Sequence, residues 1–191
     1  MLGGRANELR LNQEGRLQAQ KLAGRLAGTG IRKIFSSPVA RALETAEVIG
    51  RRLSLEVESV ADLSEIDYGA WTGKHFAKLH DELRWQRFNS YRSGTRIPEG
   101  ESMLEAQTRF VSGLERLSIA GSGADGSRLA IISHGDLIKA ALAHFVGIHL
   151  DLFQRIEIYP ASVSTVELRA DGPRVICINN CGDVDPRRDL Q

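Results

Sequence analysis

Cysteines, long apolar runs and repetitive tracts are scarce in this sequence of 191 residues. Only two cysteines occur, Cys177 and Cys181, and no second pair or neighbouring histidine completes a metal site around them. No apolar run approaches the roughly 18 residues that a membrane-spanning helix needs, and the opening MLGGRANELR has no apolar leader core. We therefore expect a cytoplasmic protein with reduced thiols, no bound metal and no membrane partner.

The sequence also lacks an excess of charge of either sign. Lysine and arginine together number 25 and aspartate and glutamate 24, which gives a formal net charge of +1. So small a net charge produces no broad field toward nucleic acid or an anionic membrane, and we expect neither as a partner. Recognition of an anion must then depend on a few side chains at one place.

The apolar pattern that is present predicts strands alternating with helices. Predicted strands cover 31–35, 54–60, 128–133, 162–169 and 174–180, and predicted helices cover 11–28, 36–53, 74–91, 101–121 and 136–146. We expect Asn12 to cap the first helix and Ser36 or Ser37 to cap the second. The alternation predicts an α/β fold, a three-layer αβα sandwich with a mostly parallel sheet, in a single domain over residues 1–191.

Two predicted strands end where a predicted helix begins, and both junctions carry side chains suited to an anion. The first strand leads to a helix with Arg41 in its first turn. The third strand, which reads as buried on both faces, leads to His134-Gly135 and a helix that we expect Asp136 to cap. Ligands of parallel α/β sheets bind beyond the carboxyl ends of the strands, where helix N-termini offer backbone N–H groups.

Each candidate side chain also has an ordinary explanation. Arg41 could pair with Glu44 or Glu47 on its own helix, and His134 could be a core histidine bonded to a backbone carbonyl. Glu65 lies in LSEIDYG, a glycine-bearing loop after a strand, where a partly dry carboxyl group can have a raised pKa and act as a general acid. Most loop glutamates are simply solvated, so the residues taken singly leave both interpretations open.

Four segments taken together are more specific. In chain order they are SSPVARALETAEVI, LSEIDYGAWTGK, PEGES and IISHGDLIKAALAHFVGI. With their spacing, these segments resemble the histidine phosphatase superfamily, which has the phosphoglycerate mutase fold and includes mutases and many small phosphatases. The resemblance extends from about Leu11 to Asn180.

The resemblance implies roles for individual residues. Arg41 corresponds to a phosphate-clamping arginine, Glu65 to the carboxyl that protonates the leaving oxygen, and His134 to the second catalytic histidine, which stabilises the transferred phosphoryl group. Ser36 and Gly135 would also contact the substrate. The family's reaction moves a phosphoryl group to a histidine nitrogen and then to water or a hydroxyl. It implies a small phosphorylated substrate and no cofactor or metal, because arginine and histidine charges supply the stabilisation. The oligomeric state stays open, with a homodimer as one option.

The family's first motif, an apolar strand that ends in Arg-His-Gly and carries the nucleophilic histidine, is not found in these 191 residues. We therefore expect a chain truncated at its N-terminus relative to the family, with the nucleophile upstream of Met1. The central first strand of the sheet would be missing, and the strands over 31–35 and 128–133 would face each other across a gap or present unpaired interior edges.

The predicted function is hydrolysis of a phosphomonoester. Two alternatives remain: a catalytically inactive relative that binds a phosphate or a partner, and a phosphoglycerate mutase. The short segment YRSGTRIPEGES favours a phosphatase, because it lacks the long basic insertion associated with glycolytic mutases.

Overall fold

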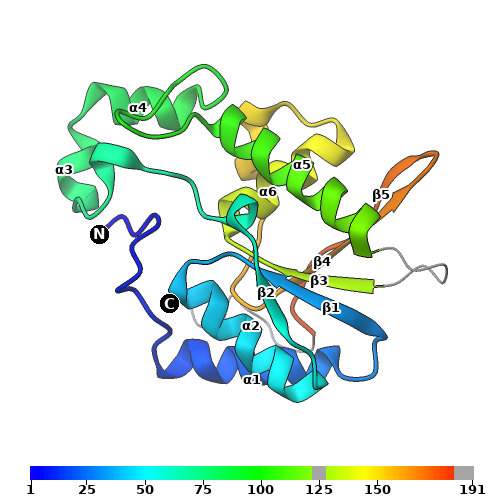
Figure 1. The fold of residues 1–191 in the computed structure, drawn as a ribbon. Helices are drawn as coiled ribbons and strands as arrows, with labels where there is room; N and C mark the ends of the chain where they lie inside the picture. The colour runs from blue at the N-terminus through cyan, green and yellow to red at the C-terminus, as the bar shows by residue number, and fades with distance from the viewer. Residues whose placement is uncertain (122–127, 183–191) are drawn as a thin grey trace.

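The computed structural model describes residues 1–121 and 128–182 (Figure 1). The segment GSGADGS over 121–127, whose glycines and serines predict a flexible connection, lies outside this part of the chain except for its first residue. The α-helices are α1 (Gln13–Leu26), α2 (Ala40–Leu53), α3 (Phe76–His80), α4 (Leu83–Ser90), α5 (Met103–Gly121) and α6 (Gly135–Val146). The strands are β1 (Ile31–Ser36), β2 (Val57–Ser59), β3 (Arg128–Ile132), β4 (Val163–Arg169) and β5 (Gly172–Asn180). Three 3-10 turns complete the set: η1 (Ala61–Leu63), η2 (Gly69–Trp71) and η3 (Leu150–Arg155).

Three parallel strands form the central sheet in the order β2-β1-β3. Successive side chains of a strand point to opposite faces, and here each face packs on its own helices. Ile34 and Ala130 belong to the apolar cluster with α1 and α2, whereas Phe35 and Ile131 belong to the cluster with α5 and α6. Figure 1 shows the two helix layers on opposite sides of the sheet. The predicted α/β sandwich with a parallel sheet is confirmed.

The strands β4 and β5 form an antiparallel ribbon of their own. Among the described residues, the ribbon shares no strand pairing with the parallel sheet. Val166 and Val175 of the ribbon pack against the apolar cluster that contains α5 and α6. The β-structure is therefore divided into two separate parts.

The pairing and the burial of β3 both differ from the prediction. First, β1 and β3 do not face each other across a gap but pair directly, with Phe35 opposite Ile131. Second, β3 is not buried on both faces: residues 129–132 are half-buried, while Ile34 and Phe35 of β1 are 1% and 3% exposed. The reason is that β3 is the last strand of the parallel sheet, so no described strand pairs with its other edge.

The helix that follows β1 starts later than predicted. It begins at Ala40, with Val39 as its N-cap residue, and neither Ser36 nor Ser37 supplies a side-chain cap. Ser36 belongs to β1 instead, and the Ser37 hydroxyl accepts a hydrogen bond from the Val39 N–H (3.2 Å) before the helix starts.

Of the two other predicted caps, one is confirmed and one is wrong. In α1 the prediction is confirmed, because the Asn12 side chain accepts a hydrogen bond from the backbone N–H of Gly15 (2.8 Å). In α6 the N-cap residue is His134, without a side-chain cap, and Asp136 lies inside the first turn. The expectation that Asp136 caps α6 is therefore wrong, because its carboxylate is drawn to Arg92 (3.2 Å).

The helix predicted over 74–91 is broken into α3 and α4. Trp85 and Phe88 of this segment form a buried group with Trp71, and their rings lie 5.2 and 5.6 Å from the ring of Trp71. The N-terminal segment passes beside this region, since Leu2 exchanges backbone hydrogen bonds with Gly73 and Lys74 (both 2.9 Å). Figure 1 shows the N-terminus next to α3.

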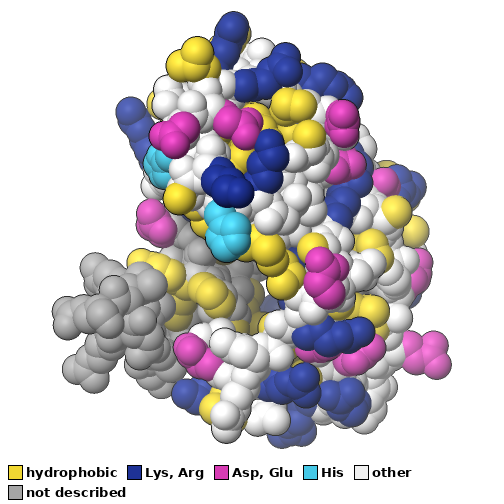
Figure 2. Space-filling view, turned by 90° about the vertical axis from the view of Figure 1, so that its left-hand side faces the viewer, with side chains coloured by type: hydrophobic (Ala, Val, Ile, Leu, Met, Phe, Trp, Pro, Cys, Tyr) yellow, Lys and Arg dark blue, Asp and Glu magenta, His cyan; other side chains and the backbone are white. Residues whose placement is uncertain are grey.

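The described helices include none that is long and apolar enough to cross a membrane. The face of the molecule in Figure 2 carries lysines and arginines interspersed with aspartates and glutamates, as the balanced composition would suggest.

Candidate active site

Arg41 lies in the first turn of α2, and its guanidinium group connects three segments of the chain. Its Nη2 donates to the backbone oxygen of Gly4 (3.0 Å) and lies 3.3 Å from Glu65 Oε2 and 3.1 Å from His134 Nδ1. One alternative partner from the sequence, Glu44, ion-pairs with a different arginine in the N-terminal segment. The structure therefore brings the three candidate catalytic residues into direct contact.

His134 follows β3 and is only 5% exposed. Its Nε2 lies 2.8 Å from the hydroxyl of Ser37, while its Nδ1 faces Arg41. A guanidinium group can only donate, so Nδ1 is the acceptor and Nε2 carries the proton that is donated to Ser37. Burial, with the positive charge of Arg41 next in importance, lowers the pKa of His134 to about 3. Near neutral pH the imidazole is therefore uncharged, with its lone pair on the Arg41 side.

Glu65 lies in the loop between η1 and η2, and its side chain is 15% exposed. Its Oε1 accepts a hydrogen bond from the Ile66 N–H (2.9 Å), and its Oε2 lies 3.6 Å from His134 Nδ1. Burial raises the pKa of Glu65 to about 7, against the opposing effects of the Ile66 N–H and Arg41. The negative charge of Asp136 raises this pKa further. A carboxyl group that is about half protonated at neutral pH can both give and accept a proton.

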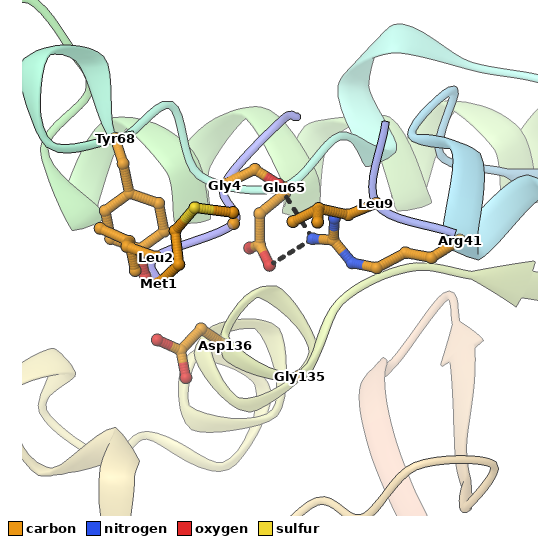
Figure 3. Close-up of a pocket in the computed structure, with 10 residues that line it drawn as sticks. Met1, Leu2, Gly4, Leu9, Arg41, Glu65, Tyr68, Gly135 and Asp136 are labelled. Carbon is orange, nitrogen blue, oxygen red and sulfur yellow. Dashed lines mark hydrogen bonds and ion pairs between the residues drawn. The ribbon is translucent and has the colours of Figure 1, made fainter. Parts of the chain in front are cut away.

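A pocket of about 430 Å³ opens beside these residues (Figure 3). Its lining consists of Met1, Leu2, Gly3, Gly4, Leu9, Arg41, Glu65, Tyr68, Gly135 and Asp136. Figure 3 shows Arg41 reaching toward Glu65 from one side, with Tyr68, Leu2 and Met1 on the other. His134 is not part of the lining and borders the pocket through Arg41 and Glu65.

Arg41 has one donor that the described residues leave without a partner. The Nη1 atom of Arg41 is buried and has no hydrogen-bond partner among the described residues. A guanidinium group with a free donor, placed at the first turn of a helix and the carboxyl end of a parallel strand, is well suited to a phosphate oxygen.

The two other residues predicted to contact a substrate are placed differently from each other. Gly135 lines the pocket at the start of α6. Ser36 does not reach it, because its side chain is fully buried and its hydroxyl donates to the backbone oxygen of Ser37 (2.9 Å). The neighbouring Ser37, not Ser36, contacts a candidate catalytic residue, His134. The sequence pattern Ser-Ser does not indicate which of the two serines faces the site.

Sequence reasoning missed three further parts of the site. Tyr68 lies within the LSEIDYG segment that identified Glu65, but its place in the pocket wall depends on how that loop turns. Asp136 was read as a helix cap and instead lines the pocket. Gly4 supplies a backbone oxygen to Arg41, which no sequence pattern signals.

Within residues 1–121 and 128–182, no group of three histidine, cysteine, aspartate or glutamate side chains is arranged to hold a metal ion. The described groups are instead an arginine with a free donor, a neutral histidine and a carboxyl group with a raised pKa. Together they can bind an anion and move a proton in its immediate surroundings.

The fold and the site thus define an α/β protein in which an arginine, a neutral histidine and a carboxyl group with a raised pKa meet beside a pocket. The sequence profile of the histidine phosphatase superfamily (branch 1) matches residues 2–181. The chain therefore belongs to this family.

Curated relatives from bacteria agree with this assignment. The chain is 34% identical over 176 residues to "Bifunctional protein Rv2228c" of Mycobacterium tuberculosis, which covers 89% of the chain and 46% of that protein. It is 30% identical over 180 residues to "Probable phosphoglycerate mutase GpmB" of Proteus mirabilis, which covers 91% of the chain and 81% of that protein. The chain thus spans about half the length of the mycobacterial relative.

Solved structures share the fold at lower identity. The mycobacterial glucosyl-3-phosphoglycerate phosphatase Rv2419c superposes with a TM-score of 0.83 at 22% identity, over 94% of this chain and 90% of that one. The phosphoserine phosphatase of Entamoeba histolytica, in complex with 3-phosphoglyceric acid, gives a TM-score of 0.80 at 23% identity, over 94% and 88%. At these identities the likeness is one of fold.

Proposed function

We propose that the chain is the main part of a phosphomonoester phosphatase that works through a phosphohistidine. The observation that carries this proposal is the single guanidinium of Arg41 in contact with both Glu65 and His134. Arg41 holds the phosphate, and Glu65 protonates the leaving oxygen. His134 acts on the transferred group through Arg41, whose guanidinium group it contacts. The substrate is a small phosphorylated compound.

The reaction has two steps. In the first, a histidine nitrogen bonds to phosphorus, the bond from phosphorus to the ester oxygen breaks, and Glu65 gives its proton to the departing alcohol. In the second, a water molecule attacks phosphorus while Glu65 takes one of its protons, and the nitrogen–phosphorus bond breaks. The products are the alcohol and inorganic phosphate, and Glu65 is again protonated. A carboxyl pKa of about 7 suits both halves of this cycle.

The nucleophilic histidine, in this proposal, comes from a strand upstream of Met1 that ends in Arg-His-Gly. Two structural features support a place for it. The outer edge of β3 has no partner among the described strands, and the β4–β5 ribbon is a separate unit that could complete the sheet on the far side. Met1 itself lines the pocket, so a strand that leads into it would end beside Arg41 and Glu65.

The two alternatives retain some support. A phosphate-binding protein without turnover agrees with the absence of Arg-His-Gly from residues 1–191. A mutase agrees with the name of the Proteus mirabilis relative. One experiment distinguishes the three functions.

The test starts from the gene. An in-frame apolar stretch upstream of Met1 that ends in Arg-His-Gly supports the proposal, and an in-frame stop codon excludes it. The chain extended by that stretch should hydrolyse 4-nitrophenyl phosphate, and replacement of the motif histidine by alanine should abolish turnover. Conversion of 3-phosphoglycerate to 2-phosphoglycerate without release of phosphate would identify a mutase. Phosphate binding without turnover in the extended chain would identify a binding protein.

A further inference from the structure

A second cluster of charged side chains lies against the loop that carries Glu65. Arg109, on α5, donates from Nη1 to the backbone oxygens of Asp62 (2.6 Å) and Ser64 (3.1 Å), and from Nη2 to that of Glu65 (3.5 Å). One guanidinium group thus holds three carbonyls of the same short loop. Its side chain is 19% exposed, so these contacts are largely shielded from water.

Glu101, from the PEGES segment, holds the other side of this guanidinium. Its two carboxylate oxygens lie 3.0 Å from Nε and 2.9 Å from Nη2 of Arg109, a two-point geometry that fixes both groups in one plane. Glu101 also reaches the loop itself, because its Oε2 accepts a hydrogen bond from the Asp67 N–H (3.3 Å). Arg5 adds contacts to Glu101 Oε1 (2.7 Å) and to the Glu65 backbone oxygen (2.8 Å).

The backbone of the loop that carries Glu65 also lies in close contact with the backbone of the PEGES segment. The Glu101 N–H donates to the Asp67 oxygen, and the Ala70 N–H donates to the Pro98 oxygen (both 3.0 Å). A Cβ atom at Gly69 would lie 2.2 Å from the Pro98 oxygen, and one at Gly100 would lie 2.3 Å from the Asp67 oxygen. The glycines therefore allow an approach that side chains would prevent.

We propose that Arg109 and Glu101 are positioning residues that hold the loop of Glu65 so that its carboxyl group faces Arg41 and the leaving oxygen. This inference rests on the proposed function for the role of Glu65. Neither side chain lines the pocket, and both act through the backbone of the loop. A proton donor must stay within a narrow range of positions to be effective, and a loop without such contacts would not keep it there.

The test uses Arg109→Lys, which keeps the positive charge but loses the planar group that binds three carbonyls and two carboxylate oxygens. The matched control is Arg116→Lys, on the same helix. Arg116 is exposed and contacts the side chain of Asp62, not the loop carbonyls. Glu101→Asp is a second charge-conserving variant, in case Arg109→Lys does not fold.

The first readout is the titration of the Glu65 carboxyl carbon by NMR in the chain of residues 1–191. We expect Arg109→Lys to lower the midpoint by about one pH unit, because a looser loop admits water to the carboxyl group. Arg116→Lys should leave the midpoint unchanged. An unchanged midpoint in both Arg109→Lys and Glu101→Asp would overturn the proposal, whether or not the protein is a phosphatase.

The second readout is turnover by the chain extended with the upstream strand. An alkyl phosphate needs a proton on its leaving oxygen, whereas 4-nitrophenyl phosphate has a good leaving group. Arg109→Lys should therefore lower kcat on the alkyl ester on the order of 100-fold and on the nitrophenyl ester only a few-fold. Equal losses on both esters would overturn the positioning role. A shifted midpoint together with no turnover in any extended chain would support the positioning of Glu65 and refute the proposed function alone.

Discussion

The strands β1 and β3 are adjacent and parallel, and both end at the candidate site, yet their surroundings differ. β1 has a hydrogen-bonded strand on each side, and its Ile34 and Phe35 are almost fully buried. β3 has one such neighbour, and its apolar residues are only half-buried. Arg41 thus follows a strand that is paired along both edges, whereas His134 follows a strand that is paired along only one edge among the described strands.

The contacts among the candidate catalytic residues can therefore be considered separately from the strand pairing beneath them. The contacts of Arg41, Glu65 and His134 are already formed in residues 1–191. The outer edge of β3, which no described strand pairs with, has backbone hydrogen-bonding groups and apolar side chains that a further strand would bind. The predictions below test whether that edge accounts for the difference.

The largest effect should come from supplying the strand. If the chain is extended upstream by an apolar strand that ends in Arg-His-Gly, about four apolar side chains become buried. At roughly 1.5–3 kcal/mol each, this amounts to about 6–12 kcal/mol, comparable with the whole stability of a typical domain. The melting temperature should rise by more than about 10 °C, as measured by calorimetry.

The control for this prediction replaces the motif histidine by alanine, which should keep the gain in melting temperature and lose turnover. An extension of equal length made of glycine and serine should give no gain. If residues 1–191 alone melt cooperatively as a monomer at the same temperature as the extended chain, the edge of β3 needs no strand.

A smaller effect should appear in a matched pair of core substitutions. Ile34 of β1 and Ile132 of β3 pack in the same apolar cluster, but Ile34 is 1% exposed and Ile132 is half-buried. Ile34→Ala should cost about 2–5 kcal/mol of unfolding free energy, and Ile132→Ala markedly less, because part of its side chain stays in water. Urea denaturation measures both.

The same two substitutions can be measured in the extended chain. There the cost of Ile132→Ala should rise toward that of Ile34→Ala, since the added strand removes water from β3. Equal costs in residues 1–191 would mean that the exposure of β3 has no energetic consequence.

The sequence predicted the parallel sheet and the residues that meet at its carboxyl edge, because strand–helix alternation and the position of each junction are local patterns. Arg41 and His134 were found in this way. The direct pairing of β1 with β3 was not predicted, since strand pairing depends on contacts far apart in the chain. The same limit applies to Arg109, which looks like any arginine on an amphipathic helix until α5 packs against the loop of Glu65.

The wrong predictions of helix caps at Ser36, Ser37 and Asp136 have a similar cause. Ser36, Ser37 and Asp136 are all good helix caps, so local rules assign them to helix starts. In the structure, tertiary partners compete for them: Ser37 contacts His134, and Asp136 pairs with Arg92. Both helices at the site begin without a side-chain cap, whereas α1 keeps its cap at Asn12.

The smallest effect concerns the two titrating groups at this edge of the sheet. Glu65 has a pKa of about 7 in the folded chain against an ordinary 4.5, so the folded chain binds the extra proton between these values. Its contribution to stability is present below about pH 4.5 and is lost as the pH rises to 7. His134 has a folded pKa of about 3 against 6.5, so its contribution is present above about pH 6.5 and is lost as the pH falls.

Between pH 4.5 and 6.5 these two dependences oppose each other, each by at most about 1.4 kcal/mol per pH unit. The wild-type free energy of unfolding should therefore change little across this window. Glu65→Gln removes one of the two dependences, so its stability should increase with pH there, as measured by urea denaturation at several pH values. Glu58→Gln, on the exposed side of β2, should keep the wild-type profile. A flat profile for Glu65→Gln would mean that Glu65 and His134 are not buried together, and that the site at the end of β3 is open to water as well as unpaired at its edge.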